Sequence, residues 1–273
     1  MTSDTLSSVR ARLTARRPRR VFRIRSMVMS GHGAALGVLS VGAVALVLLS
    51  APRFAAQVNL LPVSGELEAL QTGDMLSQPR LEKARSALAS ARRLDPGDGR
   101  LSTDLALIEL IEADRLLADP AQRRVKLEAA IADLERGLGE SPANSFAWAR
   151  LAGARRALDD RTGPKMLAAL RMSYVTGLYA DKIMPFRAAL TLADWDSLDP
   201  ELKGFAKREL IYLWERRGAW EANQLPLITL ICKTGRTGLL AQTLIEAHRS
   251  LAEFDKLYTT HLSPQGCAKL LGN

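Results

Sequence analysis

The chain has 273 residues, and its 38 Lys and Arg outnumber its 29 Asp and Glu, which gives a formal net charge of +9. That length allows one large domain or two small ones. Two Cys exclude a disulfide-rich scaffold and a cysteine-rich zinc module, and three His leave little material for a histidine metal site. A charge of +9 suggests nucleic acid as a partner, so the position of the charge along the chain decides whether that class is retained.

Most of the positive charge lies at the N-terminal end. The first 30 residues hold eight Arg, no Lys and one Asp, so this segment carries +7 and the remainder is nearly neutral. A neutral remainder offers no basic face for phosphates, and we expect no nucleic-acid partner. We expect the arginines nearest the apolar run that follows to set the orientation of the chain in a membrane; they are Arg16, Arg17, Arg19, Arg20, Arg23 and Arg25.

An uncharged stretch follows this basic tail. Residues 27–52 contain no Asp, Glu, Lys or Arg, and residues 33–51 are apolar or small on every face of a helix. Such a helix spans about 28 Å, close to the ~30 Å hydrocarbon core of a bilayer, which predicts a transmembrane helix. A buried helix of a soluble core is the first alternative, but such helices are seldom apolar all round. A cleaved signal peptide is the second, but Ala51 and Ala56 lack good cleavage contexts.

The distribution of arginine around the apolar run predicts the topology. Basic residues stay on the cytoplasmic side, so we expect a single pass through a bacterial inner membrane with the N-terminus in the cytoplasm. The bulk of the chain is then exported, into the periplasm of a Gram-negative cell. The expected parts are a basic cytoplasmic tail (1–26), a transmembrane anchor (27–51), a linker with a short helix (52–77) and an exported helical domain (78–273).

The exported part has the pattern of short helices. Pro and Gly recur at short intervals, the apolar residues between them fall at helical spacing, and no long alternating strand pattern occurs. Asp119 and Asp199 each precede a proline and an early Gln or Glu, which predicts two helix starts. The apolar run 227–232 is the one segment for which a strand stays open. We therefore predict an all-α fold.

One recurrence in this helical part is more specific. Small and large apolar residues repeat at matching distances before two prolines, and an aromatic opens the next segment; the residues are Ala84, Leu88, Ala91, Leu94 and Pro96, then Ala130, Leu134, Gly137, Leu138 and Pro142, then Trp148, Leu151 and Ala152. Residues 79–172 resemble tetratricopeptide repeats (TPR). The resemblance implies stacked helix pairs with a concave surface for protein partners. The two prolines are 46 positions apart instead of 34, so we expect an insertion around 116–125.

A second resemblance covers about half the chain. It is carried by Phe146-Ala147-Trp148-Ala149-Arg150-Leu151-Ala152, Ala169-Leu170-Arg171-Met172-Ser173, Arg187, Trp195, Leu198-Asp199-Pro200-Glu201-Leu202 and Leu213-Trp214. In this order the residues resemble the VpsP-type accessory proteins of bacterial exopolysaccharide biosynthesis. The resemblance implies a small, membrane-anchored helical protein that works in polysaccharide synthesis or export.

The sequence contains no catalytic signature. Nucleotide-binding, serine-hydrolase and zinc-protease motifs are all absent, so we expect no cofactor, no metal and no enzymatic activity. The alternative from another class is a periplasmic glycan-acting enzyme, which would need two carboxylates across the scissile bond. The available acidic pairs are Asp159 with Asp160, Asp194 with Asp196, and Glu215 with Glu221.

Two further groups of residues are candidates for binding and for cross-linking. Trp148, Trp195 and Trp220 could line a groove for a partner or a sugar, although Trp148 stands at an apolar helical position that equally suits a core. Cys232 and Cys267 are 35 positions apart, and an exported location permits a disulfide between them. The alternative is two buried free thiols.

These observations together predict a non-catalytic, membrane-anchored scaffold or adaptor of a bacterial cell-envelope machine. Exopolysaccharide synthesis or export is the favoured setting, and secretion, pilus or division assembly is the alternative. We expect protein partners in an envelope complex, and contact with the polysaccharide itself is left open.

Overall fold

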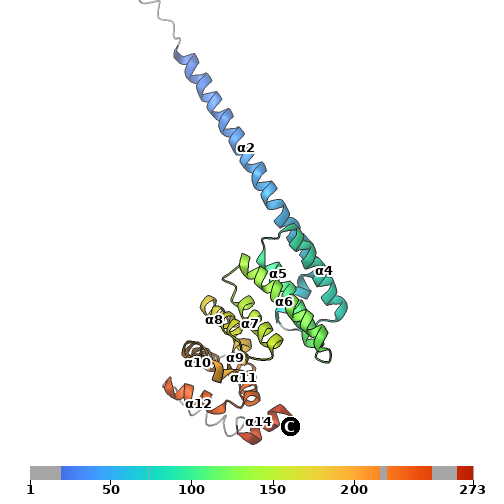
Figure 1. Cartoon of the computed structure of the whole chain (residues 1–273). Helices are drawn as coiled ribbons and strands as arrows, with labels where there is room; N and C mark the ends of the chain where they lie inside the picture. The colour runs from blue at the N-terminus through green and yellow to red at the C-terminus, as the bar shows by residue number, and fades with distance from the viewer. Residues whose placement is uncertain (1–19, 73, 216–219, 248–262, 273) are drawn as a thin grey trace, which may run out of the picture. The chain divides into compact units, whose positions relative to one another are not determined.

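The structure is a computed structural model. It describes the backbone of residues 20–72, 74–215, 220–247 and 263–272, and the side chains in these ranges except those of 20–37, 71–72, 220–226 and 270. Every regular element in the described ranges is a helix, which confirms the predicted all-α fold (Figure 1). The chain divides into two compact units, residues 1–55 and 56–273.

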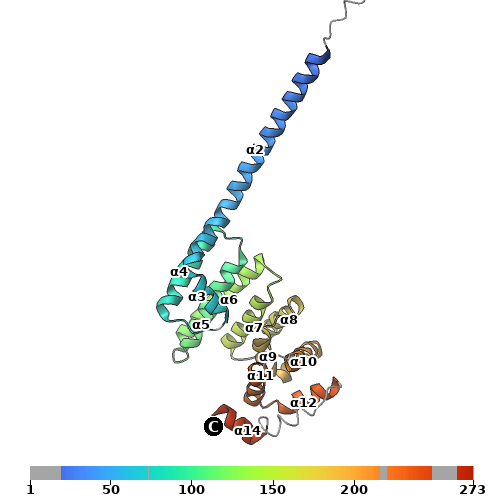
Figure 2. The ribbon, with the colours of Figure 1, turned by 180° about the vertical axis from the view of Figure 1, so that it is seen from behind.

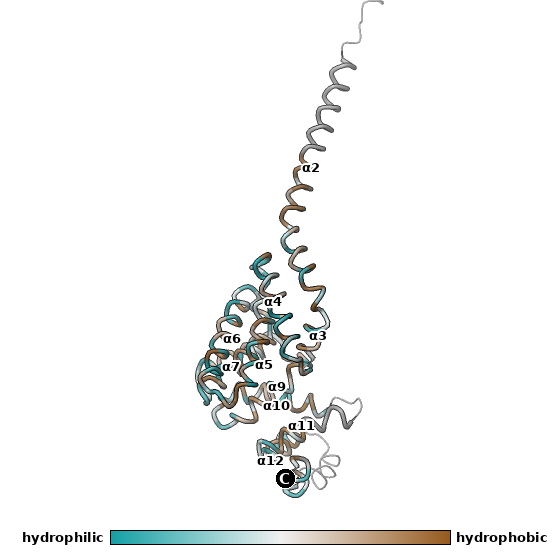
Figure 3. The backbone as a smooth tube through the Cα atoms, turned by 90° about the vertical axis from the view of Figure 1, so that its right-hand side faces the viewer, coloured by the Kyte–Doolittle hydropathy of each residue, from teal (hydrophilic) through white to brown (hydrophobic). Residues whose placement is uncertain are grey.

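The first long element is α2, which runs from Arg20 to Leu60. From Val38 to Leu49 its large apolar side chains are 59–74% exposed, and Figure 3 shows this segment as hydrophobic. Within the described residues one stretch, Val38–Leu70, is long and apolar enough to cross a membrane. Because its most apolar window is not buried against protein, this stretch does not resemble the core helix of a soluble domain.

The predicted linker, 52–77, is helical over most of its length. Helix α2 continues through Pro52 to Leu60, although Pro52 has no N–H to donate to the carbonyl of Leu48. The 3-10 helix η1 (Leu61–Val63) and the short helix α3 (Ser64–Thr72) follow directly. Pro52, the first residue of the predicted linker, therefore lies inside the helix.

Five helices then follow in close succession. They are α4 (Gln78–Leu94), α5 (Gly99–Arg115), α6 (Pro120–Glu140), α7 (Ser145–Asp159) and α8 (Pro164–Thr176). Each is joined to the next by four residues, and each packs against its neighbour in the chain (Figures 1 and 2). Connections this short keep successive helices side by side.

Local capping explains where several of these helices begin. The Asp119 carboxylate accepts a hydrogen bond from the backbone N–H of Gln122 at 3.0 Å, and Asp199 accepts one from the backbone N–H of Leu202 at 2.9 Å. Both predicted helix starts are confirmed. Asn144 caps α7 in the same way, and Asp98 accepts from Arg100 at the start of α5.

Small residues let the paired helices approach each other. A Cβ added to Gly99 in α5 would lie 2.4 Å from the carbonyl oxygen of Gly137 in α6, and a Cβ added to Gly137 would lie 2.6 Å from the carbonyl oxygen of Gly99. At the α7–α8 pair, a Cβ added to Gly177, just after α8, would lie 2.5 Å from the hydroxyl of Ser145 at the start of α7. Gly137, a small residue of the recurring pattern, is therefore required where the backbones of α5 and α6 nearly touch.

The C-terminal part continues with shorter helices. They are α9 (Met184–Ala193), η2 (Trp195–Ser197), α10 (Pro200–Glu215), α11 (Trp220–Thr234), α12 (Thr237–Glu246) and α14 (Pro264–Leu271). The run 227–232, left open between strand and helix, lies in α11 and is helical. A disulfide joins Cys232 in α11 to Cys267 in α14, with 5.3 Å between the two Cα atoms.

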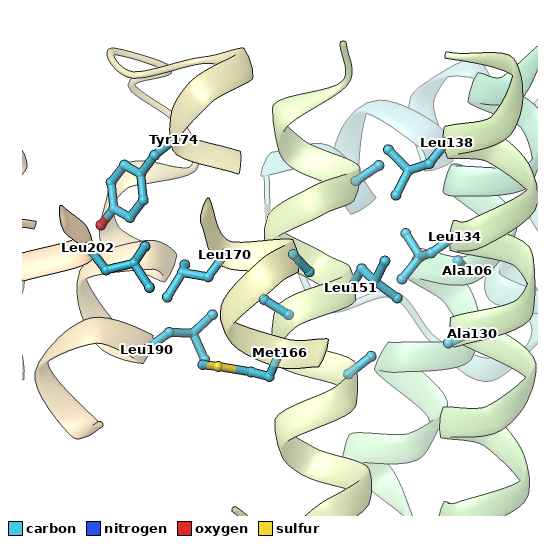
Figure 4. Packing of buried hydrophobic residues seen from close by; sticks show 14 of the residues in the cluster. Ala106, Ala130, Leu134, Leu138, Leu151, Met166, Leu170, Tyr174, Leu190 and Leu202 are labelled. Atoms are coloured by element: carbon cyan, nitrogen blue, oxygen red, sulfur yellow. The ribbon is translucent and has the colours of Figure 1, made fainter. Parts of the chain in front are cut away.

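The apolar core is divided along the chain into three clusters. The first packs Ala56 and α3 against α4 and α5, the second spans α5 to α10, and the third joins α9 to α12. Figure 4 shows the second, where Leu134 and Leu151 meet between α6 and α7 while Met166, Leu190 and Leu202 meet between α8, α9 and α10. Because each cluster draws on helices adjacent in sequence, helix order along the chain determines packing order.

Candidate binding groove

An apolar hollow of the helical unit lies between α5, α7 and α9. It has a volume of about 390 Å³. Its apolar wall comprises Leu107, Leu110 and Ile111 from α5, Leu127 from α6, Gly153, Ala154 and Ala157 from α7, and Ile183, Phe186 and Leu190 from or next to α9. Concave, mainly apolar sites with few polar groups are typical of binding pockets.

The faces of the contributing helices explain why this hollow is apolar. In α5, Leu101, Leu105 and Ile108 are buried in the first core cluster. Leu107, Leu110 and Ile111, spaced as one further helical face, line the hollow. Helix α5 thus contributes apolar side chains to the hollow as well as to the first and second core clusters.

A glycine in α7 makes room for an aromatic ring at the hollow. A Cβ added to Gly153 would lie 2.6 Å from Cζ of Phe186, so the ring lies directly against the α7 backbone. Phe186 is still 40% exposed, a large fraction for a phenylalanine. An accessible ring against a glycine forms one wall of the hollow.

A second, polar hollow of about 280 Å³ adjoins the first. Arg150 of α7 lines both, so the two hollows lie next to each other at this residue. The polar part is otherwise lined by Arg100, Thr103 and Asp104 of α5, Asn144 and Phe146 at the start of α7, and Lys182 from the α8–α9 connection. We call the two hollows together the α5–α7–α9 groove.

Arg150 and Asp104 are the electrostatic centre of this groove. Arg150 is partly buried and makes no hydrogen bond or ion pair with any residue that the structure describes. Burial lowers the pKa of Arg150, and the negative charge of Asp104, which raises this pKa, only partly offsets the effect. Burial raises the pKa of Asp104, against the charges of Arg150 and Arg100. The two groups influence each other without forming a direct pair.

The other arginines at the groove are paired. Arg156, at the α7–α9 end, donates to the Asp194 carboxylate at 2.5 and 3.3 Å. Arg100 donates to Asp98 at 3.0 and 2.8 Å. Arg150 is therefore the arginine of the groove whose guanidinium has no partner within the described ranges.

A third hollow, of about 510 Å³, lies over α4, α5 and α6 and is lined mainly by charged groups. Arg85 pairs with Glu109 and, at 2.5 Å, with Glu112. Lys126 pairs with the same two carboxylates at 3.1 and 2.8 Å. Hydrogen bonds from Lys126 and Arg85 lower the pKa of Glu112, and together they outweigh burial, which raises it. These charges neutralise one another and form a structural cluster.

A fully buried polar network joins α8, α9 and α10. Nε and Nη2 of Arg187 donate to one Glu209 carboxylate oxygen at 3.1 and 2.9 Å, and the Tyr174 hydroxyl donates to the other at 2.6 Å. Arg187 also donates to three backbone carbonyls, those of Ser173, Gly177 and Leu178. Burial raises the pKa of Glu209 to about 7, against the effect of Arg187 and Tyr174.

This buried network cannot reach a ligand from solvent, because Arg187, Glu209 and Tyr174 are each no more than 1% exposed. It connects helices and is not a catalytic site. No local pattern in the sequence predicts this network, because Arg187 and Glu209 are 22 positions apart. The signal available was an arginine inside the otherwise apolar run of α9.

Trp148 and Trp195, two of the aromatic residues singled out from the sequence, do not line the groove. The Trp148 indole N–H donates to the Pro142 carbonyl at 2.8 Å, and the ring packs on the second core cluster. Trp195 in η2 packs on the same cluster, with Lys203 Nζ 5.8 Å from its ring centroid. The Trp220 side chain lies outside the described residues. Phe186 and Phe146 supply the aromatic rings of the groove.

The remaining predicted site residues fall elsewhere. Arg16, Arg17 and Arg19 lie outside the described residues, and only the helical backbone is described for Arg20, Arg23 and Arg25. Among the acidic pairs, Asp194 pairs with Arg156, and Asp196 pairs with Arg236 at 2.6 Å. The side chain of Glu221 is outside the described part, so its distance from Glu215 is not defined.

No protein-family model matches this chain, and no curated protein or solved structure matches it either. The class of this protein is therefore defined by its fold and its groove alone. In the part of the chain that the structure describes, this is an all-helical protein with one helix long and apolar enough to cross a membrane, and with a groove on its helical unit. The resemblances to tetratricopeptide repeats and to exopolysaccharide accessory proteins stay predictions.

Proposed function

We propose that this chain is a non-catalytic, membrane-anchored adaptor that binds a protein partner in the α5–α7–α9 groove. The observation that carries the proposal is the groove itself, whose apolar wall is drawn from four helices and includes the accessible ring of Phe186. Exposed apolar surface rimmed by polar groups is typical of interaction sites. The setting is a bacterial cell-envelope machine.

The repeat-like arrangement supports a binding role. The α4–α5 and α6–α7 connections are built alike, each with a proline at its second position and an Asp or Asn side chain that caps the next helix. Alternate helices α5, α7 and α9 then line one face, as stacked helix pairs do in repeat proteins. We therefore interpret the helical unit as TPR-like.

The membrane role rests on the exposed apolar part of α2 and on the arginine-rich tail. Basic residues stay in the cytoplasm, so the helical unit lies on the outer side of the bacterial inner membrane. A reporter fused after Gly65 tests this orientation. Activity of a reporter that works only outside the cytoplasm supports it, and activity of a cytoplasmic reporter at the same position contradicts it.

Exopolysaccharide synthesis or export is the setting we favour. It rests on residues between Phe146 and Trp214 whose order along the chain resembles that of VpsP-type accessory proteins. Deleting the gene should then reduce surface polysaccharide, whereas a secretion, pilus or division defect with normal polysaccharide would favour the alternative machines. In that strain, the variants Asp196→Asn and Glu215→Gln should restore function, and their failure with intact folding would contradict a non-catalytic role.

Photo-crosslinking in cells tests the groove directly. Benzoylphenylalanine at Phe186 replaces one accessible aromatic ring by another, so it should form an adduct with a protein partner. The matched control is the same substitution at Val125, which is 61% exposed in α6 and does not line the groove. An adduct at Phe186 that is absent at Val125 supports the proposal, and equal or no adducts at both positions contradict it.

A further inference from the structure

The chemistry of the groove's partner is indicated by the unpartnered guanidinium at its centre. Arg150 is partly buried, so its guanidinium has lost part of its hydration, and no carboxylate or carbonyl in the described ranges replaces it. Buried charged groups are costly unless paired. Arg100 and Arg156 at the same groove already have carboxylate partners. An incoming anion on Arg150 would supply the missing partner.

The charges around Arg150 favour an anionic group. Lys182 also lines the polar hollow and has no hydrogen bond or ion pair within the described residues. One carboxylate, Asp104, lines the same hollow, and burial raises its pKa against the charges of Arg150 and Arg100. Two unpaired cations, Arg150 and Lys182, therefore share the polar hollow with one carboxylate, which leaves this hollow positive.

The adjoining apolar hollow favours a polypeptide over a sugar. Leu110, Ile111 and Phe186 offer no hydrogen-bonding side chains, so sugar hydroxyls placed there would be left unpaired. Among the residues that the structure describes, no tryptophan or tyrosine lines either hollow. An apolar amino-acid side chain fits such a wall without that loss.

We propose that the α5–α7–α9 groove binds a polypeptide segment that places an apolar side chain against Phe186 and, close by along the segment, a Glu or Asp carboxylate on Arg150. This inference rests on the proposed function and names the chemistry of the partner. Lys182 adds to the attraction from the rim of the polar hollow, and Gly153 keeps the apolar hollow open by leaving room for Phe186.

Selection from a random-peptide display library on the full-length protein in nanodiscs tests the inference. The peptides enriched should combine an acidic residue with a nearby Leu, Ile or Phe. A synthetic copy of the best binder and its Glu→Gln or Asp→Asn version are then compared by fluorescence anisotropy. Loss of the acid should weaken binding to the wild-type protein by about tenfold, because it removes one charge-assisted hydrogen-bonded pair.

A double-mutant cycle separates this pair from general effects. The Arg150→Gln protein should bind both peptide versions equally weakly, and Arg150→Lys should restore part of the preference for the acid. Arg161→Gln is the matched control, because Arg161 is an exposed arginine in the α7–α8 connection that lines neither hollow. This control should bind like the wild type, and the helical circular dichroism of all variants should be unchanged.

Three results would overturn the inference. They are enriched peptides without acidic residues, acidic peptides that bind Arg150→Gln as well as the wild type, and no peptide binding at all. Tighter, Arg150-dependent binding of a polyuronate oligosaccharide would also overturn it in favour of a sugar acid. If the Phe186 adduct with a cellular protein persists while the peptide test fails, this inference fails alone. If the peptide test succeeds without that adduct, the proposed function fails instead.

Discussion

Two partly or fully buried arginines in the helical unit have opposite surroundings. Arg187 is 0% exposed, and its donors are taken up by Glu209 and three backbone carbonyls. Arg150 lines an open groove and has no such partner in the described part of the chain. A satisfied buried charge holds helices together, whereas an unsatisfied charge at an accessible hollow is free to act on a ligand. The following predictions test this contrast between interior and groove.

The largest effect is expected where the interior network is broken. Arg187→Met leaves the Glu209 carboxylate buried without its main partner, so the free energy of unfolding should fall by about 3–5 kcal/mol. Urea unfolding of the full chain in detergent, followed by helical circular dichroism, measures it. A loss below about 1 kcal/mol would show that the network contributes little.

The pH dependence of stability comes next. Below about pH 4.5 Glu209 is protonated in both the folded and the unfolded protein. Between about pH 4.5 and the folded-state pKa of about 7, Glu209 stays protonated in the folded protein but loses its proton in the unfolded protein. The folded state then binds more protons than the unfolded state, so stability falls as pH rises through this window and levels off above it. The contribution is about 3 kcal/mol at most, from ~1.4 kcal/mol for each pH unit.

Glu209→Gln isolates this contribution. The variant cannot ionise, so its stability should lack the decline that the wild type shows between about pH 4.5 and 7. Unfolding curves of both proteins across that range give the difference directly. Identical slopes would contradict a raised pKa at Glu209, where Arg187 and Tyr174 are the charged and titratable groups in contact.

Alanine substitutions at two glycines compare a backbone contact in the interior with a side-chain contact at the groove. Gly137→Ala places a Cβ 2.6 Å from a backbone oxygen, so helices α5 and α6 must separate, and a loss of about 1–3 kcal/mol is expected. Gly153→Ala meets only ring atoms of Phe186, a side chain that is 40% exposed and can rotate away. Its cost should be below about 1 kcal/mol, while the Phe186 photo-adduct should weaken. Equal losses in thermal unfolding would contradict this distinction.

The smallest effect on stability is expected at the groove itself. Arg150→Met removes a partly desolvated cation without leaving a paired carboxylate behind, so the free energy of unfolding should change by less than about 1 kcal/mol. Urea unfolding beside Arg187→Met gives the comparison. A loss comparable to that of Arg187→Met would place Arg150 in the structural framework and not in the binding site.

Local features of the fold were predictable from sequence, and contacts between distant segments were not. Helix starts at Asp119 and Asp199 depend on a few adjacent residues, and the apolar run of α2 identifies itself by composition. The groove depends on α5, α7 and α9 meeting, which no local pattern shows. Aromatic composition suggested Trp148 and Trp195 as lining residues, but the exposed ring at the groove is Phe186, opposite Gly153.

The most direct measurement of the central claim is photo-crosslinking from Phe186 in living cells, with Arg150 or Gln at position 150. The account predicts a protein adduct from the otherwise wild-type chain that is strongly reduced in Arg150→Gln and unchanged in Arg161→Gln. An adduct that does not depend on Arg150, or no adduct from a folded and membrane-inserted chain, would contradict the account of this groove as the site where the anchored protein binds its partner.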